Sequence, residues 1–423
     1  MKIKIKNIND YTKELTCVVS WADLKDSFKD EFDKMKSNHT PKGGRKGKVT
    51  GINLEIFKRN YGPAIEANFA EKSLNKYFQQ AINEENLTPI DQAKVSNLDF
   101  SEGGDLTFTL SFQVVPVIKL PNYKKKFKVN MTKYIQSEQD LEMSLNELLQ
   151  QHSNIKTVDG GAESSNFIMG DFQELDEGDI PIIGKKMEKQ YIKLGIGAFT
   201  GSTEKDLLGV KSGEKRKVTV NYGEGKQAKY EISVHKVEEQ ILPDLNDDFA
   251  TTVSPELKTL DQLRDKLKKN IQHSIDDDYE KRKREEFINY FVTKTKFSAP
   301  ESMINRYLEK LVEEQSKKDN NLDKEKFRED SKVAAEFNVK WFILKDSLLE
   351  NAEISISNED LDSEINKIVK ESHEEEKKIR DFFSEQNNRG SLANNLLNDK
   401  LFSHINEFAV VKDKEKSTSE LRK

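Results

Sequence analysis

The chain has 423 residues, of which 34% are charged and 35% are apolar, and its formal net charge at neutral pH is −6. A chain of this length is too long for one hydrophobic core, because one domain typically holds about 100–200 residues. The single cysteine, Cys17, excludes a disulfide scaffold, and the lack of a long apolar run excludes a membrane span and a secretory leader. We therefore expect a soluble, cytoplasmic protein of several domains. Its acidic balance argues against nucleic-acid binding over the whole surface.

The first 115 residues combine strand and helix patterns. Apolar residues alternate over 2–6, and a largely apolar run at 15–19 follows a polar turn, which predicts two strands. A helical stripe then begins at Ala22, with Leu24, Phe28, Phe32 and Met35 on one face, and it must end near Pro41. A second helix at 64–82 and two strands at 93–100 and 106–115 follow. Residues 1–115 are thus predicted to form an α+β domain.

The middle of the chain changes character twice. Pro116 and Pro121 mark an extended linker, and the pattern of residues 138–151 predicts a helix. We assign residues 116–154 to this linker and a helix that packs with the C-terminal domain. Glycines then concentrate between residues 155 and 240, where short strand patterns alternate with turns, so this region is predicted to be a small β-rich domain.

Residues 241–423 are predicted to be almost entirely helical. Ser254 resembles an N-cap with Pro255 at the first helical position, and an apolar stripe runs over 257–275. Further helices are expected after Pro300 and after Ser357, and a last one at 391–411. Residues 412–423 are predicted to be a solvated tail. The fold class is therefore multidomain α+β, with an elongated, all-helical C-terminal domain.

The most informative local feature is a basic, glycine-rich segment after the first helix. Between Lys36 and Arg59 there are seven lysines and arginines and one acidic residue, Glu55. Glycines let a backbone approach a polyanion, and clustered cations neutralise phosphates. The alternative is an ordinary solvated turn. A nucleotide-binding phosphate loop is excluded, because it would need glycine at Lys42 and serine or threonine at Val49. We therefore expect no nucleotide and no other cofactor.

This segment, together with Tyr61-Gly62 further on, resembles the ribosome-docking signature of the trigger factor family, which reads Gly-Phe-Arg-x-Gly-Lys-x-Pro. The sequence differs from that signature at Gly44, where the family has Phe, and at Thr50, where it has Pro. The resemblance implies a ribosome-binding site made by Gly43, Gly44, Arg45, Lys46, Gly47 and Lys48.

The resemblance extends over the whole chain. Residues 112–121 resemble the family's exit from its N-terminal domain, and residues 237–249 resemble its passage into the helical domain. The family implies an ATP-independent chaperone that docks at the ribosomal tunnel exit. Its partners would be an exit-site ribosomal protein, rRNA, and nascent or unfolded polypeptides, with no membrane. Off the ribosome the family also implies a homodimer.

Residues 155–240 are similar to an FKBP-type prolyl isomerase domain, in which an aromatic-lined pocket desolvates the rotating amide. The aromatic of the pocket floor falls on Thr203, and the long aromatic-bearing loop has shortened to residues 223–226. The aromatics that remain are Phe172, Phe199 and Tyr230, a vestigial isomerase pocket that is more consistent with core packing. We expect no catalytic residue and little or no isomerase activity.

Two other interpretations remain open. The first is an active prolyl isomerase. The second is a holdase that no longer docks on ribosomes, which Gly44 and Thr50 favour. A general RNA-binding module is a weaker third, because the basic character is confined to one loop of an acidic chain. The histidines and Cys17 show no metal-ligand spacing, so no metal site is predicted.

Overall fold

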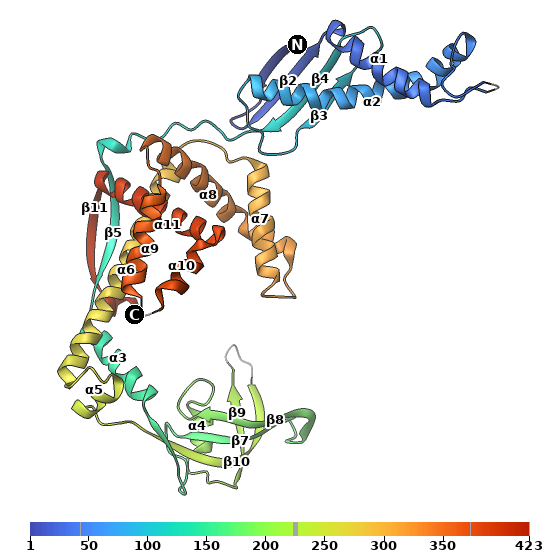
Figure 1. Cartoon of the computed structure of the whole chain (residues 1–423). Coiled ribbons are helices and arrows are strands. Elements are labelled where there is room, and N and C mark those ends of the chain that lie inside the picture. Colours follow the sequence, from blue (N-terminus) through green and yellow to red (C-terminus); the bar gives the residue numbers. More distant parts are fainter. Residues whose placement is uncertain (43, 223–226, 373, 423) are drawn as a thin grey trace. The chain divides into compact units, whose positions relative to one another are not determined.

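The computed structural model describes residues 1–42, 44–222, 227–372 and 374–422 (Figure 1). Contacts divide the chain into two compact units. The first contains residues 1–131 and 282–412, and the second contains residues 132–281 and 413–423. Helix α6 (Leu260–Lys294) and strands β5 (Phe127–Ile135) and β11 (Ala409–Ser417) run across the boundary between them.

The N-terminal part of the first unit is an antiparallel sheet covered by two helices, as the sequence predicts. The strands are β1 (Lys2–Asn7), β2 (Thr12–Val19), β3 (Lys94–Asp99) and β4 (Leu106–Gln113), in the order β1-β2-β4-β3. Helices α1 (Trp21–Asn38) and α2 (Ile52–Glu84) run side by side over this sheet (Figure 1). Their apolar faces and the alternate residues of β2 and β4 share one core, with Leu15, Phe28, Phe69 and Phe108 buried.

Two details of this part differ from the prediction. Helix α2 begins at Ile52 and not near Ala64, so Pro63 lies inside it. Proline removes one backbone donor from a helix, but Phe57 and Ile65 on either side are buried, and their packing keeps the helix continuous. Met35 belongs to the predicted stripe of α1, yet 39% of its surface is exposed, because the core ends before the last turn of this helix.

The helical part of the first unit follows the predicted helix restarts. It contains α7 (Glu301–Ser316), α8 (Lys324–Asn351), α9 (Asn358–Glu371), α10 (Glu376–Ser384), α11 (Gln386–Phe408) and the short η1 (Tyr123–Lys125). Helices α7 and α8 form a hairpin whose buried residues include Ile304, Leu308, Val339 and Ile343. Ser357 caps α9 with a reciprocal bond to Asp360, as its position predicted.

The second unit contains a β-rich domain and a small helical cluster. The strands are β6 (Asn154–Thr157), β7 (Phe167–Leu175), β8 (Pro181–Lys193), β9 (Lys215–Asn221) and β10 (Gln227–Ile241). They are ordered β6-β10-β7-β8, with β9 also paired to β10, and α4 (Ser202–Leu207) packs near β9. Helices α3 (Glu138–Gln151) and α5 (Asp247–Val253) pack with the start of α6 through Leu141, Phe249 and Leu263.

Three predictions about the C-terminal region are wrong. Ser254 is the C-cap of α5 and not an N-cap, and α6 begins only at Leu260. The last helix ends at Phe408, and the region is not all-helical, because β11 pairs with β5. Within the segment predicted to be a solvated tail, residues 412–417 belong to this strand and are followed by η2 (Thr418–Arg422), in which Thr418 is buried.

Candidate functional site

The basic segment forms the loop that joins the ends of α1 and α2 (Figure 1). Two buried side chains hold it at either side, Pro41 where it leaves α1 and Val49 where it approaches α2. Backbone bonds close it between these points: the N–H of Gly47 donates to the carbonyl of His39 at 2.9 Å, and that of Lys48 donates to Arg45 at 3.0 Å. The loop is therefore held by the core of its own domain.

Two of the predicted glycines are required by the geometry of this loop. Gly47 has φ of +77°, and a Cβ at this position would lie 3.2 Å from the backbone oxygen of Ser37. Gly44 donates its N–H to Pro41 at 3.0 Å, and a Cβ there would lie 2.7 Å from the Pro41 ring. A phenylalanine at position 44 would therefore force the turn to move. Gly43 was also predicted to belong to the site, but it lies outside the described residues.

The charged side chains of the loop point to solvent. Lys42, Arg45, Lys46 and Lys48 are all exposed, and within the described part of the chain none of them forms a side-chain hydrogen bond or ion pair. Their neighbours differ, because Lys36 pairs with Asp33 at 3.3 Å and Lys58 pairs with Glu102 at 3.0 Å. The loop thus presents four unpaired cations from a backbone that is held in place.

An aromatic cluster that sequence reasoning missed supports the root of the loop. The rings of His39, Phe57 and Tyr61 lie with their centroids 5.0–5.1 Å apart, and Phe57 also meets Phe32 edge-to-face at 5.7 Å. His39 comes from the end of α1 and the other two from the first turns of α2. The helical spacing of Phe57 and Tyr61 would have revealed them, had α2 been predicted to begin before Pro63.

In the β-rich domain, the residues predicted to be a vestigial pocket lie in the core. Phe172 on β7 and Tyr230 on β10 are 3% and 6% exposed, and their ring centroids lie 6.2 Å apart. Phe199 is half-buried and meets Phe172 edge-to-face at 5.9 Å. The Tyr230 hydroxyl accepts a hydrogen bond from Tyr222 at 3.0 Å. The structure brings the three side chains together around Phe172.

The position of the missing pocket aromatic is filled by a buried threonine. Thr203 on α4 has no exposed surface, and its hydroxyl donates to the carbonyl of Thr219 on β9 at 2.7 Å. That bond satisfies the hydroxyl and ties α4 to the sheet, so this position serves packing. Residues 223–226, where the shortened loop was predicted, lie outside the described residues.

The Asp171 side chain, next to Phe172, is engaged in ion pairs with basic side chains. Its carboxylate accepts the N–H of Lys189 at 2.9 Å and lies 3.0 Å from His235 and 3.2 Å from Lys186. These contacts, the Lys189 bond foremost, hold the pKa of the Asp171 carboxyl well below its usual range. The group is therefore an ionised partner of basic side chains at neutral pH.

An apolar pocket between α7 and α8 was not predicted. Its volume is about 490 Å³, within the usual range for ligand sites, and its apolar lining is made by Met303, Tyr307, Val339, Trp341 and Phe342. Phe342 leaves 56% of its surface exposed. Which apolar residues of α8 stay uncovered depends on how α7 packs against it, and the sequence alone could not show this packing.

A second cavity, of about 890 Å³, lies beside this pocket and shares Met303 and Phe342 with it. The extended linker of residues 115–120 forms its other wall. Val117 in this linker is fully exposed, and Val115 is 48% exposed. The two hollows adjoin through these shared residues, and both expose apolar side chains within the first unit.

The described parts of the chain contain neither a candidate metal-binding cluster nor a candidate membrane-spanning helix. No group of three or more metal-ligating side chains gathers in them. Their helices also lack the combination of length and apolar composition that a membrane span needs.

Comparison with protein-family models gives two matches. Residues 1–148 match the model of "Bacterial trigger factor protein (TF)", and residues 259–407 match that of the "Bacterial trigger factor protein (TF) C-terminus". Together these segments make up well over half of the chain.

Curated proteins of similar sequence carry the same name. The trigger factor of Chloroherpeton thalassium is 27% identical over 96% of both chains, and that of Chlorobium phaeobacteroides is 25% identical over 96% of both. The trigger factor of Bacillus cereus is 26% identical over 87% of this chain and 91% of its own.

A solved structure shares the fold across nearly the whole length. It is described as "Promiscuous Substrate Recognition in Folding and Assembly Activities of the Trigger Factor Chaperone". It superposes with a TM-score of 0.54 at 19% identity, over 96% of this chain and 99% of its own.

Proposed function

The chain belongs to the trigger factor family, and we propose that the loop between α1 and α2 is the part through which it docks on the ribosome. Membership of this family makes it a ribosome-associated chaperone that acts on folding polypeptides. The observation that carries the proposal is the set of four exposed, unpaired cations on a loop held by Pro41, Val49 and the Gly47–His39 bond.

The chemistry of the loop suits an RNA and protein surface rich in phosphates and carboxylates. Arg45 offers a planar guanidinium that can bind phosphate through two parallel hydrogen bonds, while Lys46 and Lys48 act as compact charges. Among the described residues, these groups have no side-chain partner that would have to be displaced before they bind. The contact would release counterions, so its affinity should fall steeply with salt.

Ribosome co-sedimentation across a salt series tests the docking proposal. We expect the wild-type chain to pellet with ribosomes at low salt and to be released as salt rises. The triple variant Arg45→Glu/Lys46→Glu/Lys48→Glu should stay in the supernatant at every salt concentration. A matched control, Lys25→Glu/Lys29→Glu/Lys34→Glu, changes the net charge equally on exposed positions of α1 and should pellet like the wild type.

Two results would contradict the proposal. Equal loss of pelleting in both triple variants would mean that net charge, and not the loop, controls docking. A wild-type chain that never pellets would favour the alternative in which Gly44 and Thr50 have abolished docking, leaving a freely diffusing holdase.

The accessible apolar surface of the first unit is proposed to hold unfolded client segments. Met303 and Phe342 lie where the two hollows meet, so an extended segment could place neighbouring apolar side chains in both. Such contacts are weak and lose out once a client buries its own apolar residues. Suppression of aggregation of a chemically denatured protein, without ATP, measures this activity.

Four further expectations stay as proposals. The domain boundaries are placed at residues 1–115, 116–154, 155–240 and 241–423, which limited proteolysis tests. The chain is proposed to act in the cytoplasm and to form homodimers when free of the ribosome, which fractionation and sedimentation velocity test. The β-rich domain is proposed to lack isomerase activity, because Thr203 fills the pocket floor and Phe172 and Tyr230 are buried in the core.

A further inference from the structure

Helix α2 carries apolar side chains on the face that does not meet the core of its domain. The core side of its first turns carries Phe57 and Ile65, which are both buried. Ile52 and Ile56 lie one turn apart and, at about 100° of rotation per residue, on the opposite side of the helix. Their side chains are 76% and 42% exposed, so nothing in the described part of the chain covers them.

The stripe that begins with these two isoleucines continues along α2. Arg59 and Pro63 follow Ile52 at seven and eleven residues, which is the spacing of one helix face, and both are exposed. Glu55 lies at one side of the stripe and is the acidic residue nearest to it in sequence. Single exposed apolar residues are common, but a solvent face that is apolar at three of its four positions indicates a contact surface.

This stripe adjoins the docking loop. Lys48 precedes Ile52 by four residues, so their Cα atoms lie at most about 15 Å apart. The loop from Lys42 to Lys48 contributes cations but no apolar side chain, and the apolar residues at its two ends, Pro41 and Val49, are buried. Ile52 is therefore the first exposed apolar side chain after the cations, and a partner that binds the loop meets the stripe next to it.

A stable docking contact needs more surface than the loop offers. Specific interfaces bury about 800 Å² on each partner, through roughly 20–30 residues. Residues 42–48 are too few for this, and their charged contacts weaken steeply as salt rises. An apolar contact beside the loop would add buried area and would not depend on the release of counterions.

We propose that Ile52 and Ile56 form the apolar part of the docking surface and pack on an apolar patch of a ribosomal protein. We assign this contact to protein because the RNA backbone presents charged phosphates, which suit the neighbouring cations and not isoleucine. Arg59, at the end of the stripe, would meet a carboxylate at the edge of the patch. This inference rests on the proposed docking of the loop and specifies the kind of partner surface that the same site recognises.

Dissociation constants of the labelled full-length chain for vacant ribosomes, measured across a salt series, separate the two kinds of contact. The variant Ile52→Ser/Ile56→Ser should bind about tenfold more weakly than the wild type at every salt concentration, the loss expected when two partly exposed isoleucines are no longer buried on binding. The slope of affinity against salt should stay as in the wild type, because no cation is removed.

Two further sets of variants control for the chemistry and the position of this change. Ile52→Leu/Ile56→Leu keeps the apolar surface and should bind like the wild type. Ile180→Ser/Ile183→Ser makes the same substitution at exposed isoleucines of the β-rich domain and should also bind like the wild type. A photo-crosslinking residue in place of Ile52 should capture a ribosomal protein on vacant ribosomes, where no nascent chain competes.

The outcomes separate the apolar contact from the docking proposal. Wild-type affinity of the serine variant, with the Arg45→Glu/Lys46→Glu/Lys48→Glu variant unable to bind, would overturn the apolar contact alone. A changed salt slope would do the same, because the isoleucines would then act by placing the cations, as would an equal loss in the β-rich domain control. Capture of rRNA alone, of a second copy of this chain, or of nothing would also overturn it. A wild-type chain that binds at no salt concentration would overturn the docking proposal as well.

Discussion

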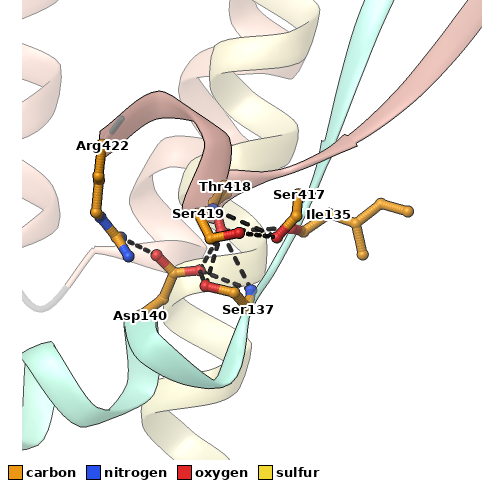
Figure 2. A network of polar contacts seen from close by, with 7 residues as sticks. All are labelled: Ile135, Ser137, Asp140, Ser417, Thr418, Ser419 and Arg422. Carbon is orange, nitrogen blue, oxygen red and sulfur yellow. Dashed lines mark hydrogen bonds and ion pairs between the residues drawn. The ribbon is translucent and has the colours of Figure 1, made fainter.

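The buried carboxylate of Asp140 links two segments of the second unit that are far apart in the sequence (Figure 2). Asp140, in the first turn of α3, forms a capping box with Ser137 and also accepts bonds from Thr418 and Arg422 of η2. The carboxylate is only 7% exposed. Burial by itself would raise its pKa, but the hydrogen bonds from these partners outweigh burial and lower the pKa from 3.8 to about 2.

The lowered pKa of Asp140 predicts an acid-sensitive attachment of the C-terminal segment. Its ionised form stabilises the folded state above the unfolded pKa of 3.8, and this contribution is lost as the pH falls toward about 2. The shift corresponds to about 2 kcal/mol. Asp140→Asn should therefore lower the free energy of local opening of residues 409–422 by about that amount at pH 7. Hydrogen exchange of these residues measures it.

The difference between wild type and Asp140→Asn should shrink as the pH falls from 4 toward 2 and vanish below about 2, because the wild-type carboxyl then becomes protonated as well. Asp360→Asn is the matched control, since Asp360 caps α9 in the same way with Ser357 and its pKa is also lowered to about 2. It should leave exchange of residues 409–422 unchanged. A pH-independent difference at Asp140 would mean that the loss arises from shape and not from charge.

At the scale of elements, sequence patterns correctly predicted those helices and strands whose formation depends on neighbouring residues. Alternation over 2–6 gave β1, and the capping pattern at Ser357 gave the start of α9, because each depends on a few adjacent residues. The start of α2 was missed because Gly62-Pro63 is a strong breaker signal that buried Phe57 and Ile65 override. The α7–α8 pocket depends on how the two helices pack against each other. The pattern of residues in a single sequence does not show that packing.

The strand β11 shows why the C-terminal segment was mistaken for a tail. Its sequence, AVVKDKEKS, carries no alternation after the first residues, and most of its side chains are exposed. Its structure comes from pairing with β5, which lies some 280 residues earlier in the chain. The pairing satisfies backbone N–H and C=O groups of this strand, whichever way its side chains face. Hydropathy patterns cannot report such bonds.

Stepwise truncation should separate the two attachments of this segment. A chain ending after Ser417 loses η2, and with it Thr418 and Arg422 as partners of Asp140, but keeps the β5–β11 pairing. A chain ending after Phe408 also loses β11, which leaves the backbone of β5 without that strand. We expect amides of β5 to exchange rapidly only in the shorter chain. The buried Phe127 and Val129 should become more accessible at the same time, as proteolysis near β5 would reveal.

Rapid β5 exchange already in the longer truncation would mean that η2 holds the strand in place. Unchanged exchange in both would mean that β5 is stabilised by its packing alone, through contacts such as the stacking of Phe127 on Tyr290 at 4.3 Å.

At the scale of the whole molecule, the two compact units divide the proposed activities. The docking loop and the apolar hollows both belong to the first unit, which contains residues 1–131 and 282–412. The β-rich domain, which we propose to be isomerase-like, belongs to the second, which contains residues 132–281 and 413–423. If clients are held at the proposed surface of the first unit, this holding would not require chemistry in the β-rich domain of residues 155–240.

This division predicts a chaperone that prevents aggregation without accelerating prolyl isomerisation. Uncatalysed isomerisation limits refolding to tens or hundreds of seconds. The full-length chain should leave that slow phase unchanged in a proline-limited protein, because buried Thr203 occupies the pocket floor and Phe172 lies in the core. It should still suppress aggregation of the same protein. An authentic FKBP-type isomerase, added in equal amount, provides the positive control. A faster slow phase at substoichiometric amounts of this chain would show that Phe199 and its neighbours still bind a prolyl ring, and would establish the active-isomerase alternative.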